Sequence, residues 1–265
     1  MCRVLFAVGE GERIKPLLDA FVKASENDPY KAARGKGSQH KDGWGYVLFR
    51  DGSLTHYRSE RPVFEDLEAV NKLSESLHDF TVLLAHSRAA SQGSKDLFNV
   101  QPFAFSTRRG FSFWLYHNGD LDKKRIIDLA EFEEKDFEKA SDSYAFAAYL
   151  CRKLESPSEE DLLRHYSLIA TTTRTSFNTG TLFLSPDSMV GFVTAYAEPT
   201  YLLKRQNWEY VRQIVLREEG LFAVASSTLE LYHKAKWKNA VNGTAFYVEI
   251  DHKNEDFNVK ELILG

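Results

Sequence analysis

The chain begins MCRVLFAV over residues 1–8, so a cysteine stands directly in front of an apolar run. The run over residues 3–8 predicts a buried strand with Cys2 at its start. If Met1 is removed, Cys2 carries a thiol and a free α-amine on one residue. These groups titrate near ~8.5 and ~8, so the amine can take the thiol proton as sulfur attacks a carbonyl carbon. The alternative is that Cys2 is only a small buried side chain.

The composition is that of an ordinary globular protein. Of the 265 residues, 43% are hydrophobic and 27% charged, which suffices for one sizeable core. We therefore expect residues 1–265 to form a single domain. The net charge of -4, without a basic cluster interleaved with aromatic residues, argues against nucleic acid or an anionic membrane as a partner.

Cysteine usage and the first residues of the chain predict a cytoplasmic protein. Only Cys2 and Cys151 occur, so a disulfide framework of the secreted type is not expected. The sequence has no basic region followed by an apolar export segment, and no uninterrupted apolar stretch of membrane-spanning length. We expect a protein that is neither exported nor anchored.

Strand patterns predominate at both ends of the sequence and helical patterns in the middle. Helical spacing covers residues 14–25, 64–78, 121–130, 142–154 and 159–170. Strand patterns cover residues 44–50, 54–58, 81–86, 101–106, 111–117, 181–184, 190–195, 201–204, 210–216, 221–226 and 244–250. This order does not suit a regular βαβ alternation, and favours an α+β fold of two sheets with helices outside them.

Two motifs place polar groups at the ends of early strands. In HKDGWGY (residues 40–46), Gly43 and Gly45 flank Trp44 and allow close backbone approach; the alternative is a tight turn and nothing more. In AHSRAAS (residues 85–91), Arg88 follows a strongly apolar strand. Its planar guanidinium can grip a carboxylate through two parallel hydrogen bonds, while a surface arginine is the simpler interpretation.

Two further motifs lie in the middle of the chain. In YHNGD (residues 116–120), the Asn118 side-chain amide and the Gly119 backbone N–H supply two donors, an arrangement that stabilises an oxyanion. Asn-Gly is also the commonest tight-turn dipeptide. In SDS (residues 141–143), Ser141 or Asp142 can cap the following helix, or Asp142 can face the ammonium group of a ligand.

Taken together and in this order, the motifs resemble the class II glutamine amidotransferase family, whose members are N-terminal nucleophile hydrolases. The ordered set comprises Met1-Cys2, HKDGWGY, AHSRAAS, NVQPF (residues 99–103), HNGDL (117–121), SDS and VASS (224–227). Each motif is weak alone, but the ordered set is specific. The HKDGWG stretch is most similar to the branch in which the glutaminase domain stands alone. The resemblance implies a four-layer αββα sandwich of two mainly antiparallel sheets between helical layers.

The resemblance also implies a reaction. Cys2 would attack the side-chain amide carbon of glutamine, ammonia would leave, and water would hydrolyse the remaining γ-glutamyl thioester. Asn118 and Gly119 would form the oxyanion hole. No cofactor is implied, and no metal is expected, because the histidines lack metal-ligand spacing. A separate synthase that accepts the ammonia is a partner that the resemblance allows, and the sequence leaves the oligomeric state open.

The remaining site residues implied by the resemblance bind the amino-acid end of the substrate. Arg88 would hold the α-carboxylate and Asp142 the α-ammonium group. Ser91 falls where the family places a hydroxyl near the substrate carboxylate. Gly43 falls in the loop that approaches the nucleophile.

Departures from the family pattern leave the substrate open. Tyr144 follows SDS where the family usually has an acidic residue, Gln101 replaces a histidine, and residues 225–229 read ASSTL instead of the usual late pattern. Tyr144 and Gln101 could line a pocket altered for a γ-glutamyl compound. Three alternatives therefore remain: an N-terminal cysteine hydrolase of a γ-glutamyl peptide or another amide, a non-catalytic glutamine-binding subunit, and a mixed α/β protein in which the motifs coincide by chance.

Overall fold

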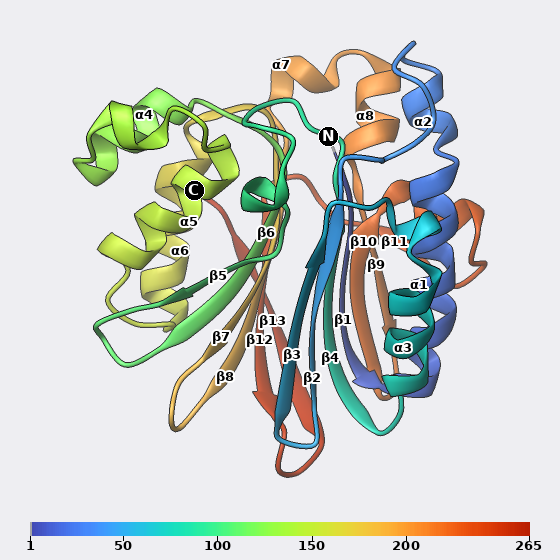
Figure 1. Ribbon diagram of the computed structural model, residues 1–265. Coiled ribbons are helices and arrows are strands. Elements are labelled where there is room, and N and C mark those ends of the chain that lie inside the picture. Colours follow the sequence, from blue (N-terminus) through green and yellow to red (C-terminus); the bar gives the residue numbers. More distant parts are fainter. Residues whose placement is uncertain (1) are drawn as a thin grey trace.

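Two antiparallel sheets lie face to face between two layers of helices in the computed structural model, which describes residues 2–265 (Figure 1). Sheet A contains, in spatial order, β11 (Lys238–Asn239), β9 (Gln213–Glu218), β10 (Leu221–Ser226), β1 (Arg3–Glu10), β4 (Phe80–Ser87), β2 (Trp44–Arg50) and β3 (Ser53–Ser59). Sheet B contains β13 (Asp256–Ile263), β12 (Thr244–Asp251), β8 (Met189–Ala195), β7 (Thr173–Leu184), β6 (Ser112–Leu121) and β5 (Phe103–Ser106). The expected α+β sandwich is confirmed.

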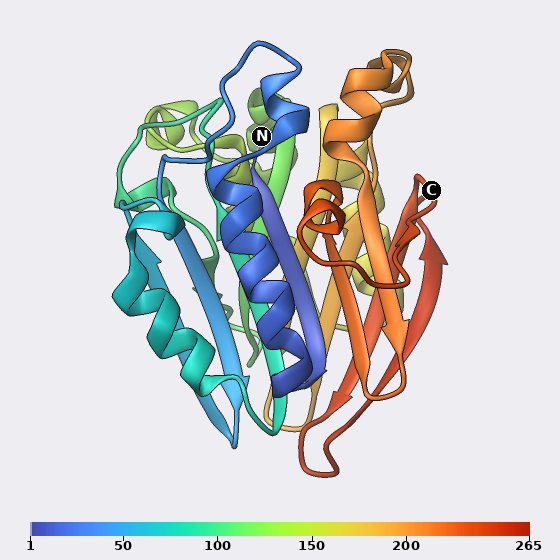
Figure 2. The ribbon, with the colours of Figure 1, turned by 90° about the vertical axis from the view of Figure 1, so that its right-hand side faces the viewer.

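Helices cover the outer face of each sheet. On sheet A these are α1 (Gly11–Glu26) and α3 (Leu67–Ser76), which Figure 2 shows in front of the strands. On sheet B they are α5 (Asp142–Lys153) and α6 (Glu159–Ala170), with α4 (Lys123–Ala130) beside α5. None of the helices within residues 2–265 is both long and apolar enough to cross a membrane.

Short helical elements complete the chain and lie mostly in connections. They are α2 (Pro29–Ala32), α7 (Pro199–Leu202), α8 (Arg205–Val211) and the 3₁₀ turns η1 (Val63–Glu65), η2 (Leu97–Asn99), η3 (Glu134–Phe137) and η4 (Ser227–Leu231). In Figure 1, α2, α7 and α8 lie at the same end of the sandwich as the start of β1.

Strand β1 lies in the middle of sheet A and is buried on both faces, which explains its apolar sequence. Leu5 and Ala7 pack in the core between sheet A and its helices, whereas Val4 and Phe6 pack in the core between the two sheets. A strand that is covered on both faces needs apolar residues at every position. Cys2, two residues before Val4, continues the row that faces sheet B.

Several elements differ from the sequence predictions. The strand predicted over residues 210–216 begins only at Gln213, because helix α8 extends to Val211, and the short edge strand β11 was not predicted. The prediction of a strand over residues 201–204 is wrong: Pro199 begins helix α7, and the Glu198 carboxylate accepts a hydrogen bond from Tyr201 N at 3.0 Å. Strand β7 begins at Thr173, earlier than expected, because its polar first half pairs with the end of β6. Strand β13 was not predicted, since it is a partly exposed edge strand. The hairpin of β2 and β3 is confirmed.

Candidate active site

Cys2 and Asn118 meet across the two sheets, 116 residues apart in sequence. The backbone N of Cys2 donates a hydrogen bond to Asn118 Oδ1 at 2.7 Å. Both residues are buried. The pairing arises because β1 lies within sheet A and β6 faces it from sheet B. A cysteine at the start of one strand and an asparagine near the end of the other therefore lie at the same end of the sandwich.

The Asn118-Gly119 pair lies within strand β6, so the alternative of a tight turn is wrong. Its two residues pair with Asn178 and Phe177 of β7. A backbone N–H can donate only to the oxygen of a side-chain amide, so Asn118 Nδ2 is the atom that remains available. Among the hydrogen bonds of residues 2–265, none uses this Nδ2 as a donor.

Gly119 is required where it stands because another backbone approaches it closely. A Cβ atom at this position would lie 1.6 Å from the carbonyl oxygen of Ser176. The Ser176 hydroxyl also donates to the Asn118 carbonyl oxygen at 2.9 Å, which fixes the strand at this point. Any side chain at Gly119 would displace the Asn118 backbone, so the glycine holds the two predicted donors in place.

Arg88 and Gly43 lie beside Cys2. Arg88 follows β4 directly, and its backbone N donates to the Gly43 carbonyl oxygen at 2.8 Å. The next backbone N, that of Ala89, points at Cys2 Sγ at 3.4 Å. Gly43 has φ +97°, and a Cβ there would meet Val100 and the Ser59 backbone. Cys2, Arg88 and Gly43 are thus brought together in the structure.

The Arg88 guanidinium is buried but only partly paired. Its Nη2 donates to the Gln92 carbonyl oxygen at 3.1 Å, while Nη1 has no partner among the described residues although it is buried. The side chain is 3% exposed, so the surface interpretation of this arginine is wrong. A buried N–H group that lacks a protein acceptor suits an anionic ligand.

Asp142 opens helix α5, and Ser141 caps that helix by accepting a hydrogen bond from Tyr144 N at 3.2 Å. The Asp142 carboxylate instead turns toward the end of β6, where it accepts from Leu121 N at 2.7 Å. Burial raises the pKa of Asp142 and outweighs the opposite effect of nearby His117. The side chain is therefore a buried acid close to the Asn118-Gly119 strand.

Ser91 lies farther from the other candidates. It is exposed, and its hydroxyl donates to Asp120 Oδ1 at 2.5 Å. Sequence reasoning missed Gln92, which connects two candidates: its backbone oxygen accepts from Arg88, and its Nε2 lies 3.4 Å from Asp142 Oδ2. A glutamine in a loop does not by itself indicate a binding site. Only its spacing, four residues after Arg88, could have suggested that it lies near the site.

A second polar network supports the opposite face of β1. Arg3 Nε donates to Asp28 Oδ2 at 2.7 Å, His40 Nε2 lies 2.8 Å from the same oxygen, and Thr228 donates to Asp28 Oδ1 at 3.1 Å. Burial alone would raise the pKa of Asp28, but Arg3 and His40 outweigh it and hold this pKa well below its usual range. Burial lowers the pKa of His40 to about 3. This network anchors the residue that follows Cys2.

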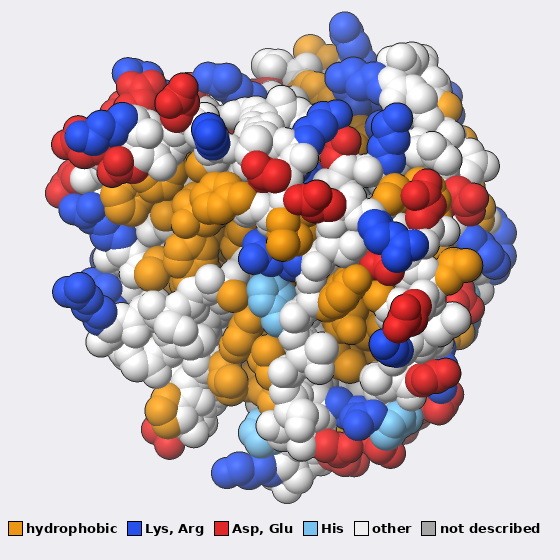
Figure 3. Space-filling view, viewed as in Figure 1, with side chains coloured by type: hydrophobic (Ala, Val, Ile, Leu, Met, Phe, Trp, Pro, Cys, Tyr) orange, Lys and Arg blue, Asp and Glu red, His pale blue; other side chains and the backbone are white. Residues whose placement is uncertain are grey.

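The two departures from the family motifs have local structural partners. The Gln101 side chain is buried, and its Oε1 accepts from His117 N at 2.6 Å, which supports β6 beside Asn118. Tyr144 belongs to an aromatic cluster with ring centroids 4.6 to 6.2 Å from its own; the other rings are Phe98, Phe103, Phe105 and Phe137. Figure 3 shows hydrophobic side chains gathered over α5 and β5 on this face.

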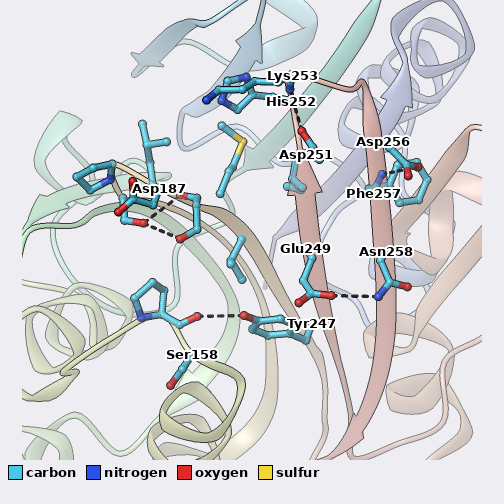
Figure 4. Close-up of a pocket in the computed structure, with 18 of the residues that line it drawn as sticks. Ser158, Asp187, Tyr247, Glu249, Asp251, His252, Lys253, Asp256, Phe257 and Asn258 are labelled. Carbon is cyan, nitrogen blue, oxygen red and sulfur yellow. Dashed lines mark hydrogen bonds between the residues drawn. The ribbon is translucent and has the colours of Figure 1, made fainter.

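A cavity of about 750 Å³ lies at the other end of sheet B, among the β7–β8 and β12–β13 turns (Figure 4). Within residues 2–265, its lining includes none of the candidate site residues. Most hydrogen bonds of its lining join residues close in sequence, such as that from Asn258 Nδ2 to Glu249 Oε2 at 3.0 Å, although Tyr247 OH also donates to the Pro157 carbonyl oxygen at 3.4 Å. Among the described residues, no three or more His, Cys, Asp or Glu side chains are grouped so that they could hold a metal ion.

Comparison with solved structures shows that two enzyme structures of low sequence identity share this fold. The glutamine phosphoribosylpyrophosphate amidotransferase from B. subtilis, complexed with ADP and GMP, is similar at a TM-score of 0.63 and 16% identity, over 99% of this chain and 49% of that chain. A structure described as the allosteric regulatory enzyme of purine biosynthesis has a TM-score of 0.67 and 16% identity, over 100% and 49%. The glutamine aminotransferase class-II domain protein from Silicibacter pomeroyi has a TM-score of 0.52 and 12% identity, over 99% of both chains.

The family model described as "Glutamine amidotransferases class-II" matches residues 26–165, just over half of the chain. The protein therefore belongs to the class II glutamine amidotransferases. The family supports hydrolysis or transfer of the glutamine amide as the general class of reaction. The chain spans about half the length of the first two structures, and Cys2 lies outside the matched range. No curated protein matches the sequence.

Proposed function

We propose that this protein hydrolyses the side-chain amide of glutamine, with Cys2 as an N-terminal nucleophile, and that residues 1–265 act as one domain. The observation that carries the proposal is the contact of Cys2 N with Asn118 Oδ1 at 2.7 Å, beside Gly119. Acyl transfer needs a thiol, an amide donor and a backbone N–H. Here the two donors come from a strand on the opposite sheet, and the amide donor has no partner within residues 2–265.

In the proposed reaction, removal of Met1 turns the Cys2 backbone N into an amine. The amine takes the thiol proton as the Cys2 sulfur forms a bond to the amide carbon. The carbon–nitrogen bond then breaks, the same proton passes to the leaving nitrogen, and ammonia departs. Water cleaves the γ-glutamyl thioester to glutamate and restores the thiol.

The oxyanion that forms on the substrate needs fixed donors. Asn118 Nδ2 has no partner among the described residues. Gly119, the next residue along β6, supplies a backbone N–H as the second donor. Preorganised donors cost no reorganisation when negative charge develops, which is why such groups contribute strongly to the rate. The close approach of Ser176 to Gly119 supports the role, because it keeps this backbone in place.

The proposed amino-acid clamp consists of Arg88 and Asp142. Arg88 Nη1 would bind the α-carboxylate, and the Asp142 carboxylate would bind the α-ammonium group. Gln92 now contacts both residues, so a bound amino acid would replace its contacts. Gly43 would shape the loop beside the nucleophile, and Ser91 would act through Asp120 at the rim. The acceptor of the ammonia, including any synthase, is not identified by these residues.

Reaction with a glutamine-mimicking diazo-ketone tests the proposal. Intact-mass analysis of chains that have lost Met1 should show one adduct, mapped to Cys2, and chains that retain Met1 should remain unmodified. Cys2→Ala should abolish the adduct, whereas the matched Cys151→Ala variant should label normally. Labelling confined to Cys151, or none on processed chains, contradicts the proposal. Comparing glutamate release from glutamine and from a γ-glutamyl peptide then distinguishes the two substrate classes.

A further inference from the structure

His86 is a fully buried residue on β4 whose side chain lacks hydrogen bonds. Its exposure is 0%, and neither Nδ1 nor Nε2 has a partner among the residues that the structure describes. Burial holds the pKa of His86 well below its ordinary value, with a smaller contribution from Arg88. The ring is therefore neutral, with one N–H donor and one lone-pair acceptor, and both are unused.

The strand register places His86 just below the candidate nucleophile. His86 pairs with Val4 of β1, and Cys2, two residues before Val4 and just ahead of the strand, continues the same face. Diagonal neighbours of this kind lie about 7–8 Å apart. Leu84, two residues before His86, packs in the core between the sheets, so the imidazole faces the same space.

Across that space, His86 lies against a residue that belongs to the oxyanion strand. The ring centroids of His86 and Tyr116 are 6.3 Å apart, with an interplanar angle of 28°. Tyr116 precedes Asn118 by two residues on the same face of β6. The His86–Tyr116 pair thus forms the layer directly beneath the Cys2–Asn118 pair.

A histidine at this position needs an explanation. A buried polar group without a partner destabilises the fold, and Val82 and Leu84, the two preceding residues on this face of β4, are ordinary apolar residues. An aliphatic side chain would avoid this cost. Arg88, the next residue in the same alternation, also has an unpartnered buried nitrogen. Polar nitrogens without partners on His86 and Arg88 thus lie near Cys2. The proposed reaction releases ammonia and takes up water at this place.

We infer that His86 is a positioning residue that binds the small neutral molecule exchanged at the substrate carbonyl: ammonia after amide cleavage, and water before thioester hydrolysis. The inference rests on the proposed function. Ammonia and water each donate and accept hydrogen bonds, as the neutral ring does. The acceptor nitrogen of His86 accepts a hydrogen bond from one O–H of the water. This bond orients the lone pair of the water oxygen toward the carbonyl carbon. The new C–O bond forms and the C–S bond breaks. The proton of the water passes to the Cys2 amine and from there to the departing sulfur, and His86 does not take it.

His86→Leu removes both polar atoms, whereas the matched His86→Gln variant restores a donor and an acceptor. Rapid acid quenching and intact-mass analysis measure the fraction of Cys2 held as thioester. His86→Leu should slow hydrolysis about tenfold, the effect of about one lost hydrogen bond in the transition state, so the thioester accumulates. His86→Gln should recover most of the rate. The fraction is counted only over chains that acylate, so misfolded protein does not affect it.

Labelled ammonium distinguishes the two molecules. In wild-type protein, attack of ¹⁵N-ammonia on the thioester returns labelled glutamine, and His86→Leu should lower this exchange. A fall in hydrolysis alone assigns the site to water, and a fall in exchange alone assigns it to ammonia; either supports the inference. Unchanged hydrolysis and exchange in His86→Leu overturn it. If wild-type protein neither labels at Cys2 nor forms a thioester, the proposed function fails instead.

Discussion

The two ends of the sandwich differ in how their polar groups are held. At the Cys2 end, polar groups are buried, and residues far apart in sequence contact one another, as Cys2 and Asn118 do. At the other end, a cavity of about 750 Å³ lies among hairpin turns, and most hydrogen bonds of its lining join residues close in sequence, with Tyr247 to Pro157 as an exception. This cavity therefore lies away from the residues to which the proposed chemistry is assigned. Buried polar atoms without partners locate the candidate site better than cavity volume does.

The largest effect is expected for Cys2→Ala, which removes the proposed nucleophile. Glutamate release from glutamine should fall at least about a thousandfold, because the other groups only support the attack of its sulfur. The matched Cys151→Ala variant should keep its activity, since Cys151 lies on α5 and its thiol donates to the Ser106 carbonyl oxygen at 3.8 Å, away from the candidate site residues. Equal losses in the two variants would contradict the role of Cys2 as the nucleophile.

Asn118→Asp should cause the next largest loss. It keeps the shape of the side chain but replaces the Nδ2 donor with an oxygen, so kcat should fall about 100- to 1000-fold. Asn178→Asp is a matched control, because Asn178 pairs with Asn118 in the sheet while its amide donates to the Val211 carbonyl. The control should lower thermal stability and leave kcat per folded molecule nearly unchanged. A kcat near wild type in Asn118→Asp would exclude the oxyanion role.

Arg88→Lys tests whether the buried polar groups at the Cys2 end bind the substrate. A lysine cannot reproduce the planar pair of donors, so KM for glutamine should rise about 10- to 100-fold, with a smaller change in kcat. Arg217→Lys, on the exposed end of β9, is the control and should leave KM unchanged. If kcat falls while KM stays constant, Arg88 acts on the transition state and the carboxylate assignment is wrong.

Acid should destabilise the network behind Cys2. The pKa of His40 is about 3 in the fold and about 6.5 in an unfolded chain, so between these values the unfolded state binds the extra proton. Stability should therefore fall as pH drops from about 6.5 toward about 3, with a slope of up to about 1.4 kcal/mol per pH unit. Protonation of Asp28 adds a further loss below about 3.8, because its pKa is lowered in the fold. Urea unfolding at several pH values measures the slope, which should be shallower in His40→Phe.

The sequence predicted much of the frame and most members of the site. The apolar run over residues 3–8 identified β1, because a strand covered on both faces has a composition that reveals it. The order of the motifs predicted a single site that contains Cys2, Arg88, Asn118 and Asp142. The structure places all four residues at one end of the sandwich. Their catalytic and binding roles stay predictions.

Features that depend on distant partners could not be read locally. The first half of β7 is polar, and it forms a strand because β6 supplies hydrogen bonds along its length. The unused nitrogens of His86 and the Asp28–His40 contact also depend on residues far along the chain. Asn118-Gly119 has the local sequence of a turn, and only pairing with β7 makes it a strand.

The smallest effect is expected at the cavity end, where Glu249→Gln is matched with Asp142→Asn. Each substitution replaces one carboxylate with an amide. The Glu249 side chain is 48% exposed and accepts from Asn258, a contact that a glutamine oxygen preserves, so stability should stay within about 0.5 kcal/mol and turnover within about twofold. Asp142 is 3% exposed and accepts from Leu121 N, so Asp142→Asn should raise KM for glutamine by removing the negative charge near the ammonium group. A change in KM for Glu249→Gln as large as that for Asp142→Asn would mean that the cavity takes part in glutamine binding, and that the end of the sandwich with buried polar groups is not the whole site.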